Sequence, residues 1–311
     1  MGFSDVVRLP SPTGADLAMR HEPSAGGAVG VVHINHGLAE HAARYARFAQ
    51  FLGARGLHVY AHDHRGHGLT SASGAPLGRF GGGREAADLV IRDVVAVHDH
   101  IAGAHPGLPI ILFGHSMGGL IGLNAVMRLH ERIAGAAIWN ANFSAGAAGY
   151  AARAALAWER FRLGSDVPSR ILPALTFRAW ARTVEDRRTD FDWLSRDAAE
   201  VAKYVADPLC GFDASVEMWS AVFDFVFGGA DDRALSGIRK DLPFHLVGGG
   251  RDPATDMGKA VRNLDNRLRA TGHSNPKTTI YADNRHESLN ELNRDAVMAD
   301  FVQWAGAIVR P

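Results

Sequence analysis

The sequence predicts an α/β protein, with a mainly parallel sheet, helices on both of its faces and one long helical insertion. Apolar runs typical of strands alternate with segments whose apolar residues recur at helical spacing, which indicates βαβ units. The strand candidates are almost continuously apolar, as expected for a sheet that is covered on both faces. Residues 143–240 break the alternation, because their pattern is helical and contains no clear strand.

Eight strand candidates follow one another along the chain. The first two form a hairpin through the turn residues PTGA. The strand candidates are residues 5–11, 16–22, 28–37, 57–63, 109–116, 133–141, 243–250 and 278–284. Between and after them, helix candidates carry one apolar face each. They are residues 42–55, 85–102, 119–130, 257–270 and 294–309.

The helical block divides the predicted domain. We expect a core built from residues 1–142 and 241–311, interrupted by a cap, or lid, at residues 143–240. Prolines would break the helices of this cap. Its aromatic residues interleave with arginines, which fits an acyl tunnel with a basic rim in transient contact with a lipid surface. Ordinary helix packing with solvated arginines is the alternative.

Composition excludes some classes of function. Lys+Arg and Asp+Glu balance at 33 each, so charge gives no support for binding nucleic acid. The single cysteine, Cys210, allows no internal disulfide and fits a reducing compartment. The first ten residues lack the pattern of a signal peptide, and no apolar run approaches the roughly 20 residues of a membrane helix. We expect a cytoplasmic protein, and the oligomeric state stays open.

One serine has the context of a nucleophile. Gly114-His115-Ser116-Met117-Gly118 fits the pattern G-x-S-x-G and lies between a strand candidate and a helix candidate. A sharp turn there forces the serine into a strained backbone conformation, and its neighbours two residues away must be small so that the backbones can pass. The alternative is a glycine-rich turn that happens to contain a serine.

A serine nucleophile needs a base and an acid that orients the base. In this type of fold the chain order is Ser, then Asp or Glu, then His. Asp252 and His286 each follow a strand candidate, at the carboxyl ends where open α/β sheets keep their chemistry. We therefore predict a triad of Ser116, Asp252 and His286. Asp256 and Asp283 are the alternative acids.

The chain has 16 histidines, and several of them are rivals of His286 for the role of the base. His273 lies between a helix and a strand candidate, at the wrong edge of the sheet. His115 is next to the serine but points away from it. His33, His58 and His245 lie in strand candidates, where we expect them to be packed.

Two backbone N–H groups are expected to form an oxyanion hole. One belongs to Met117, the residue after the nucleophile, and the other to Leu38, in the loop after the strand candidate 28–37. A plain strand exit at His36-Gly37 is the alternative.

Six segments outside most of the cap match a known group of proteins. They are NHGLAEHAARY (35–45), AHDHRGHGLTS (61–71), FGHSMGG (113–119), DPLCGF (207–212), GGGRDP (248–253) and RHESLNE (285–291). With them the chain resembles the α/β-hydrolase superfamily, and in particular the serine hydrolases of the monoacylglycerol lipase and lysophospholipase type. The resemblance implies the α/β-hydrolase fold, an eight-stranded sheet with a helical cap.

The resemblance also implies an activity. It implies hydrolysis, through an acyl-enzyme intermediate and without cofactor or metal, of acyl esters of small polar alcohols such as monoacylglycerols or lysophospholipids. Glu40 and Arg44 would stand near the polar head of the substrate, with His115 as a further substrate-binding candidate. A structural ion pair of Glu40 with Arg44 is the alternative.

Two features of the sequence are compatible with other classes of function. The run His62-Asp63-His64-Arg65-Gly66-His67 resembles the H-x-H-x-D-H ligands of metallo-β-lactamase-type hydrolases, but Gly66 replaces the required Asp. A hydrolase fold can also serve as a non-catalytic binding module. The serine argues against dehalogenase or epoxide hydrolase chemistry, whereas thioesterase, lactonase, peptidase and C–C hydrolase activities stay open.

Overall fold

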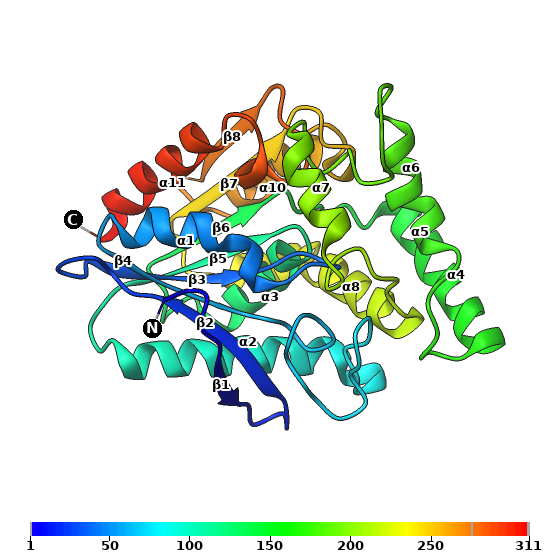
Figure 1. The fold of residues 1–311 in the computed structure, drawn as a ribbon, viewed down its shortest axis with the longest axis horizontal. Helices are drawn as coiled ribbons and strands as arrows, with labels where there is room; N and C mark the ends of the chain where they lie inside the picture. Colours follow the sequence, from blue (N-terminus) through cyan, green and yellow to red (C-terminus); the bar gives the residue numbers. More distant parts are fainter. Residues whose placement is uncertain (1, 275, 310–311) are drawn as a thin grey trace.

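The computed structural model describes residues 2–274 and 276–309. Its described residues form one eight-stranded sheet in the order β1-β2-β4-β3-β5-β6-β7-β8 (Figure 1). The strands are β1 (Val7–Pro10), β2 (Asp16–Glu22), β3 (Gly30–Asn35), β4 (Leu57–His62), β5 (Ile110–His115), β6 (Gly135–Trp139), β7 (Phe244–Gly249) and β8 (Lys277–Tyr281). β2 is antiparallel to both of its neighbours, and every pair from β4 to β8 is parallel. The predicted fold class is confirmed.

Five helices follow the strand candidates as expected and cover the sheet. They are α1 (Ala46–Gly53), α2 (Ala86–Ala104), α3 (Met117–Leu129), α10 (Lys259–Ala270) and α11 (Arg294–Val309). Short 3-10 helices precede or follow several loops: η1 (Ala42–Tyr45), η2 (Gly83–Glu85), η3 (Pro253–Thr255) and η4 (Ser288–Asn290). α1 and α11 lie on one face of the sheet, and α2, α3 and α10 on the other (Figure 1).

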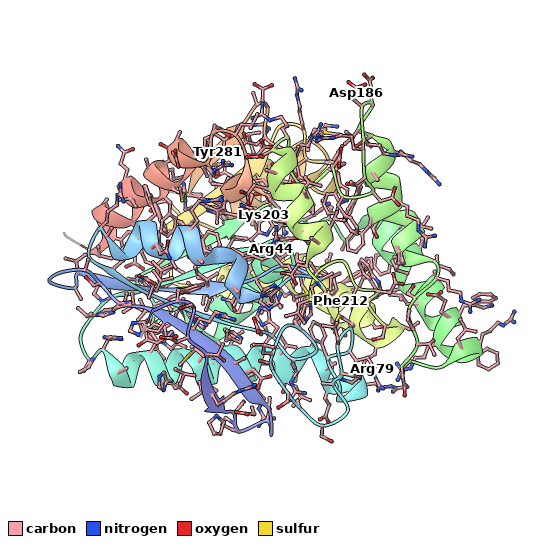
Figure 2. All side chains as sticks on the ribbon, viewed as in Figure 1. Arg44, Arg79, Asp186, Lys203, Phe212 and Tyr281 are labelled. Carbon is pink, nitrogen blue, oxygen red and sulfur yellow. The ribbon has the colours of Figure 1, made fainter. Side chains whose placement is uncertain are left out.

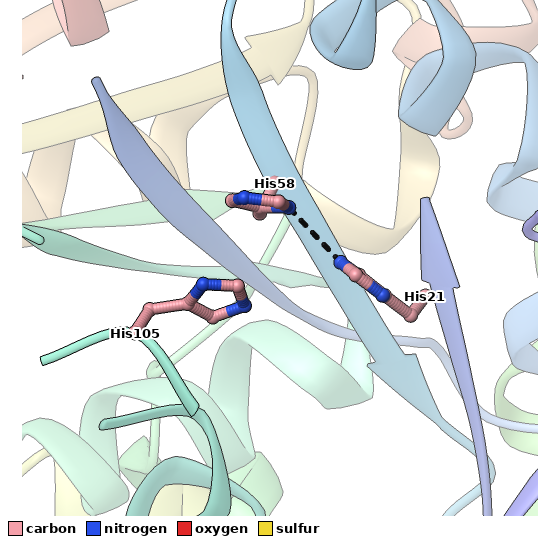
Figure 3. A group of neighbouring side chains, drawn as sticks. All are labelled: His21, His58 and His105. Carbon is pink, nitrogen blue, oxygen red and sulfur yellow. Dashed lines mark hydrogen bonds between the residues drawn. The ribbon is translucent and has the colours of Figure 1, made fainter. Parts of the chain in front are cut away.

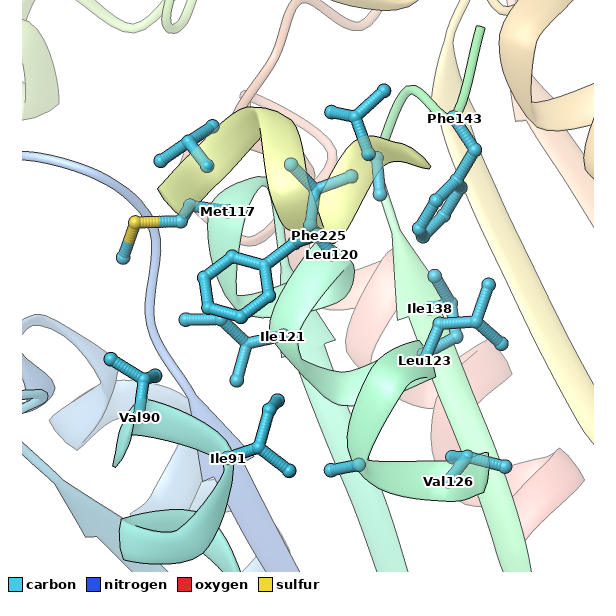
Figure 4. Close-up of a cluster of buried hydrophobic side chains, with 14 of the residues drawn as sticks. Val90, Ile91, Met117, Leu120, Ile121, Leu123, Val126, Ile138, Phe143 and Phe225 are labelled. Carbon is cyan, nitrogen blue, oxygen red and sulfur yellow. The ribbon is translucent and has the colours of Figure 1, made fainter. Parts of the chain in front are cut away.

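Alternate residues of the central strands supply the two sides of the core. Phe113 and Trp139 pack against Phe48 of α1 and Phe301 of α11. On the opposite face, Ile138 and the neighbouring strand residues pack against α3, where Figure 4 shows a cluster of buried hydrophobic side chains. The two-faced burial explains why the strands read as continuous apolar runs.

The chain between β6 and β7 is helical, as the sequence predicts. It contains α4 (Gly146–Leu163), α5 (Leu172–Leu175), α6 (Phe177–Arg182), α7 (Ala198–Ala206), α8 (Val216–Gly229) and α9 (Asp232–Gly237). α8 packs against α2 and α3, where Phe225 contributes to the same buried cluster as Ile121 (Figure 4). This part of the insertion is therefore built into the main core. No helix of the described residues is long and apolar enough to cross a membrane.

Candidate active site

The turn between β5 and α3 holds Ser116 in a strained conformation. Its φ of 54° and ψ of −121° are values that residues with a side chain rarely adopt. The flanking glycines are required by close backbone contacts. A Cβ atom on Gly114 would lie 2.1 Å from the carbonyl oxygen of Gly118, and one on Gly118 would lie 2.0 Å from that of Asn35. The turn has the geometry that the sequence pattern predicts.

The structure brings Ser116, His286 and Asp252 together from three strand ends. Nε2 of His286 lies 2.8 Å from Oγ of Ser116. Nδ1 of the same ring lies 3.0 Å from both carboxylate oxygens of Asp252. The side chains of His286 and Asp252 are both buried. The distances allow a proton to pass from the serine to an imidazole that the carboxylate orients.

Asp252 is held by more than the imidazole. Its carboxylate accepts hydrogen bonds from the N–H of Ala254 (3.0 Å), the hydroxyl of Thr255 (2.8 Å) and the side-chain amide of Asn140 (3.0 Å). Burial alone would raise the pKa of Asp252, but His286 and these donors hold the pKa below its ordinary value. The group is therefore a carboxylate at neutral pH.

Sequence reasoning missed Asn140 and Thr255. The strand candidate 133–141 includes Asn140, but β6 ends at Trp139 and Asn140 has a φ of 49°. A polar residue directly after a core strand was the signal that could have found it.

The rival acids and histidines lie elsewhere. The carboxylate of Asp256 faces Lys259, and that of Asp283 lies 3.1 Å from Arg251, in both cases on the surface. His273 precedes β8, at the edge of the sheet expected for it.

The expectation for the strand histidines is only partly met. His33 and His245 are fully buried. His58, which we expected to be packed, is the second residue of β4 and is partly exposed, so that expectation is wrong.

The two expected oxyanion donors border the same cavity as Ser116. Met117 is the first residue of α3, and the first N–H groups of a helix have no partner within it. Leu38 follows β3. The N–H of Gly37, just before it, donates to the Glu40 carboxylate at 2.6 Å, which fixes the loop that carries Leu38.

Behind the nucleophile lies a buried network of charges. The guanidinium of Arg44 donates to both carboxylate oxygens of Glu287 (2.6 and 2.7 Å) and to Glu40. Arg44, labelled in Figure 2, also lies over the ring of Tyr204 in α7, 4.8 Å from its centre. Burial alone would raise the pKa of Glu40, but Arg44 and His115 keep the pKa well below its usual range. The ion pair that the sequence left open is formed.

His115 links this network to the triad. Its Nε2 lies 3.0 Å from the carbonyl oxygen of His286, and its Nδ1 lies 3.6 Å from Glu40. Burial alone would lower the pKa of His115, but the Glu40 carboxylate raises the pKa above its ordinary value. A ring that keeps its proton can donate to the backbone of the loop that carries His286.

Two hollows border Ser116. The larger has a volume of about 170 Å³ and a mainly apolar wall, formed among others by Leu38, Met117, Leu120, Phe177, Trp180, Trp219, Val222 and Val226. The smaller, about 30 Å³, is bordered by Glu40, His115, Tyr204 and Glu287. Arg44 lies behind Glu40 and borders a separate hollow of about 20 Å³. Of the three expected substrate-binding residues, Glu40 and His115 thus reach the surroundings of the nucleophile.

The run of histidines after β4 forms a tight turn. The carboxylate of Asp63 accepts the N–H groups of Ala42 and Leu69, both at 2.8 Å. Gly66 has a φ of +70°, and a Cβ atom there would lie 1.9 Å from the carbonyl oxygen of Arg79. This close contact explains the glycine that replaces the metal-binding Asp.

Comparison with known proteins places this site in a family. The family model described as Serine aminopeptidase, S33 matches residues 26–293. The chain belongs to this family of α/β-hydrolases. The chain is 29% identical to the monoacylglycerol lipase of Mycolicibacterium smegmatis over 279 residues, which cover 88% of the chain and 87% of that protein.

Further relatives agree with this placement. The chain is 33% identical to the human monoglyceride lipase over 130 residues, which cover 42% of the chain and 40% of that protein. Its structure superposes on a thermostable carboxyl esterase of Bacillus coagulans, solved with glycerol, with a TM-score of 0.89. The two chains are covered to 99% each at 22% identity, a level at which the likeness shows the fold.

Proposed function

We propose that the protein is a serine carboxylic-ester hydrolase that acts on acyl esters of small polar alcohols, of the monoacylglycerol or lysophospholipid type. The observation that carries this proposal is the contact of 2.8 Å between His286 Nε2 and Ser116 Oγ, beside an apolar cavity. The identity of 29% with a monoacylglycerol lipase over most of both chains supports it.

The first half of the proposed reaction forms an acyl-enzyme. His286 Nε2 takes the hydroxyl proton as Ser116 Oγ attacks the ester carbonyl carbon. The N–H groups of Leu38 and Met117 stabilise the oxyanion of the tetrahedral intermediate. Asp252 holds the imidazole in the required tautomer and stabilises the imidazolium. When the intermediate collapses, His286 gives the proton to the oxygen of the leaving alcohol.

The second half releases the acid. Water attacks the acyl-enzyme carbonyl as His286 takes one of its protons, and the same proton returns to Ser116 Oγ when the carboxylic acid leaves. The hydrogen bond from His115 to the His286 carbonyl supports this step, because the base must keep its place through both halves.

We propose different roles for the two hollows. The apolar hollow suits the acyl chain, since apolar surface gains from leaving water. The smaller hollow suits the alcohol part of the ester, which would meet Glu40 and His115 as the sequence resemblance implies. Arg44 acts through Glu40 in this arrangement.

We propose that the first four helices of the insertion form a cap over the nucleophile. Phe177 and Trp180 of α6 border the acyl hollow, and the Trp193 ring lies 5.0 Å from that of His286. The outer surface of α4 exposes Tyr150, Trp158 and Phe161, the last with 88% of its surface in water. This apolar surface among arginines supports transient contact with a lipid surface.

A panel of substrates tests the proposal. The panel contains monoacylglycerols and lysophosphatidylcholines of increasing acyl length, p-nitrophenyl esters, acyl thioesters and amino-acid p-nitroanilides, with Ser116→Ala as the inactive control. We expect the highest kcat/KM with an acyl ester of glycerol or glycerophosphocholine. Faster turnover of the amino-acid anilides would overturn the ester proposal in favour of the peptidase activity that the family description carries.

A further inference from the structure

Three histidines meet outside the active site. His21, His58 and His105 face one another in Figure 3, and come from β2, from the start of β4 and from the end of α2. The fold explains why. The antiparallel register pairs His21 with Tyr60, so His58, two residues earlier in β4, lies on the same face of the sheet. The cluster lies at the edge of the sheet opposite Ser116, because β4 begins there and β5 ends at the serine.

The ring nitrogens are close enough to share an ion. One ring nitrogen of each histidine lies within 4.8 Å of the others. Nε2 of His21 is 3.1 Å from Nδ1 of His58, and the rings of His58 and His105 stack with their centres 4.1 Å apart. Three imidazoles around one tetrahedral Zn²⁺ hold their nitrogens roughly 3.4 Å apart, given Zn–N bonds of about 2.0–2.1 Å. Nδ1 of His58 also accepts the N–H of Ser24 at 3.3 Å, so binding of one ion requires the stacked rings to rotate and the ion to replace this hydrogen bond.

The surroundings keep these imidazoles neutral. Burial, and then the neighbouring His58 and His105, lower the pKa of His21 to about 4. Burial and the next histidines likewise lower the pKa of His58 and of His105. Neutral imidazole is the form that binds a metal ion.

Tyr60 contacts two of the three histidines and orients them. Its hydroxyl lies 2.8 Å from Nε2 of His105, and its ring stacks on that of His21 with their centres 4.1 Å apart. When Nε2–H of His105 donates to the phenol oxygen, Nδ1 carries the free lone pair. Hydrogen bonds of this kind fix the tautomer of metal-binding histidines.

We propose that His21, His58 and His105 form a binding site for a divalent transition-metal ion such as Zn²⁺. Three imidazoles supply three ligands, and water completes a tetrahedral site. Nitrogen ligands select Zn²⁺, Ni²⁺ or Cu²⁺ over Mg²⁺ and Ca²⁺, which prefer oxygen. The bound ion would tie β2 and the end of α2 to β4. This site is independent of the proposed ester hydrolysis.

A second cluster could compete in a binding experiment. His41, Asp207 and Cys210 also lie close together. His41 is already bonded to Asp207 at 2.8 Å, and burial raises the pKa of the Cys210 thiol, which therefore keeps its proton. This cluster is the less suitable one, and a Cys210→Ser variant separates the two.

Calorimetric titration of the metal-free protein with ZnCl₂ at pH 7.5 tests the site. We expect one Zn²⁺ per chain, no saturable binding of Mg²⁺, and a melting temperature that rises with Zn²⁺. The His21→Gln/His58→Gln variant keeps one of the three imidazoles, so its stoichiometric binding of Zn²⁺ should be lost. In Tyr60→Phe the affinity should fall about tenfold, because loss of a ligand-orienting partner costs roughly 10–100-fold. Cys210→Ser and His130→Gln, which removes a partly exposed histidine outside the cluster, should bind as the wild type does.

Two results would overturn the proposal. One is the absence of stoichiometric Zn²⁺ binding by the wild-type protein. The other is unchanged affinity in the His21→Gln/His58→Gln variant. Electron paramagnetic resonance of the Cu²⁺-loaded wild type gives a test without any variant: nitrogen hyperfine splitting is expected, and a spectrum of oxygen ligands alone would contradict the site.

Discussion

The histidines at the two edges of the sheet differ in the groups that they face. At the carboxyl edge, His286 faces Asp252 at 3.0 Å and His115 faces Glu40 at 3.6 Å. At the opposite edge, His21, His58 and His105 face one another. A carboxylate neighbour can orient an imidazole and stabilise the charge that it acquires in proton transfer, whereas neighbouring imidazoles can share a metal ion through their lone pairs. The same residue type is thus suited to proton transfer at one edge and to metal binding at the other.

The largest effect is expected at the nucleophile. Ser116→Ala removes the only atom proposed to form the acyl-enzyme, so kcat should fall roughly a million-fold. The variant should unfold at nearly the same temperature as the wild type, since it removes one oxygen atom. Ester turnover and thermal melting of the same preparation measure both. An active Ser116→Ala would contradict the proposal that the carboxyl edge of the sheet holds the catalytic residues.

The next largest effect concerns the partner of His286. Asp252→Asn keeps the shape of the side chain but favours the wrong tautomer of the imidazole, and kcat should fall about ten-thousand-fold. Asp256→Asn is the matched control, because this exposed carboxylate faces Lys259 and should leave kcat within about twofold. Equal damage by both substitutions would show that the acid has been assigned wrongly.

The buried network can be compared with a surface pair. Arg44→Met leaves Glu40 and Glu287 buried without their cation, which should lower the free energy of unfolding by about 3–5 kcal/mol. Arg47→Met breaks only the half-exposed pair with Glu200 and should cost at most about 1 kcal/mol. Urea denaturation of the two variants measures the difference, and equal losses would contradict a special role for the network.

The smallest effect per residue is expected in the pH dependence of stability. Burial lowers the pKa of His62, His67 and His245 to about 3 in the folded chain. The unfolded chain binds a proton near pH 6.5 and the folded chain does not, so stability is full above about pH 6.5 and falls as the pH drops toward 3. Below pH 6.5, each such histidine lowers the free energy of unfolding by about 1.4 kcal/mol per pH unit, which amounts to roughly 2 kcal/mol at pH 5.

His245→Phe sharpens this prediction. The ring of His245 stacks on Trp304 in the core, so Phe can replace its packing without binding a proton. Between pH 6.5 and 5, the stability of the variant should fall less steeply than that of the wild type, because the variant takes up about one proton fewer on unfolding. Urea denaturation at several pH values measures the slopes, and identical slopes would show that His245 does not titrate as described.

Local rules were sufficient to predict most of the fold and of the site. Strand ends and chain order led from Ser116 to Asp252 and His286, because in a parallel sheet the carboxyl ends meet at one edge. The glycines at 114 and 118 were explained by the same turn. These inferences need only the sequence near each strand end.

The rest depends on pairing that the sequence does not display. The cluster of His21 with His58 requires β2 to pair antiparallel with β4, although β3 lies between these two strands in the sequence. The contact of Arg44 with Glu287 joins residues 243 positions apart. The place of α8 in the main core was hidden for a similar reason, since its apolar pattern fits a cap as well as a core.

The most direct test of the account is covalent labelling of the nucleophile. The wild-type protein is treated with a fluorophosphonate at neutral pH, and the adduct is located by intact mass and peptide mapping, with Ser116→Ala treated in parallel. We predict one adduct per chain, on Ser116, loss of ester turnover in step with labelling, and no adduct on the variant. An unlabelled wild type that still hydrolyses esters, or an adduct on another residue, would contradict the proposed triad.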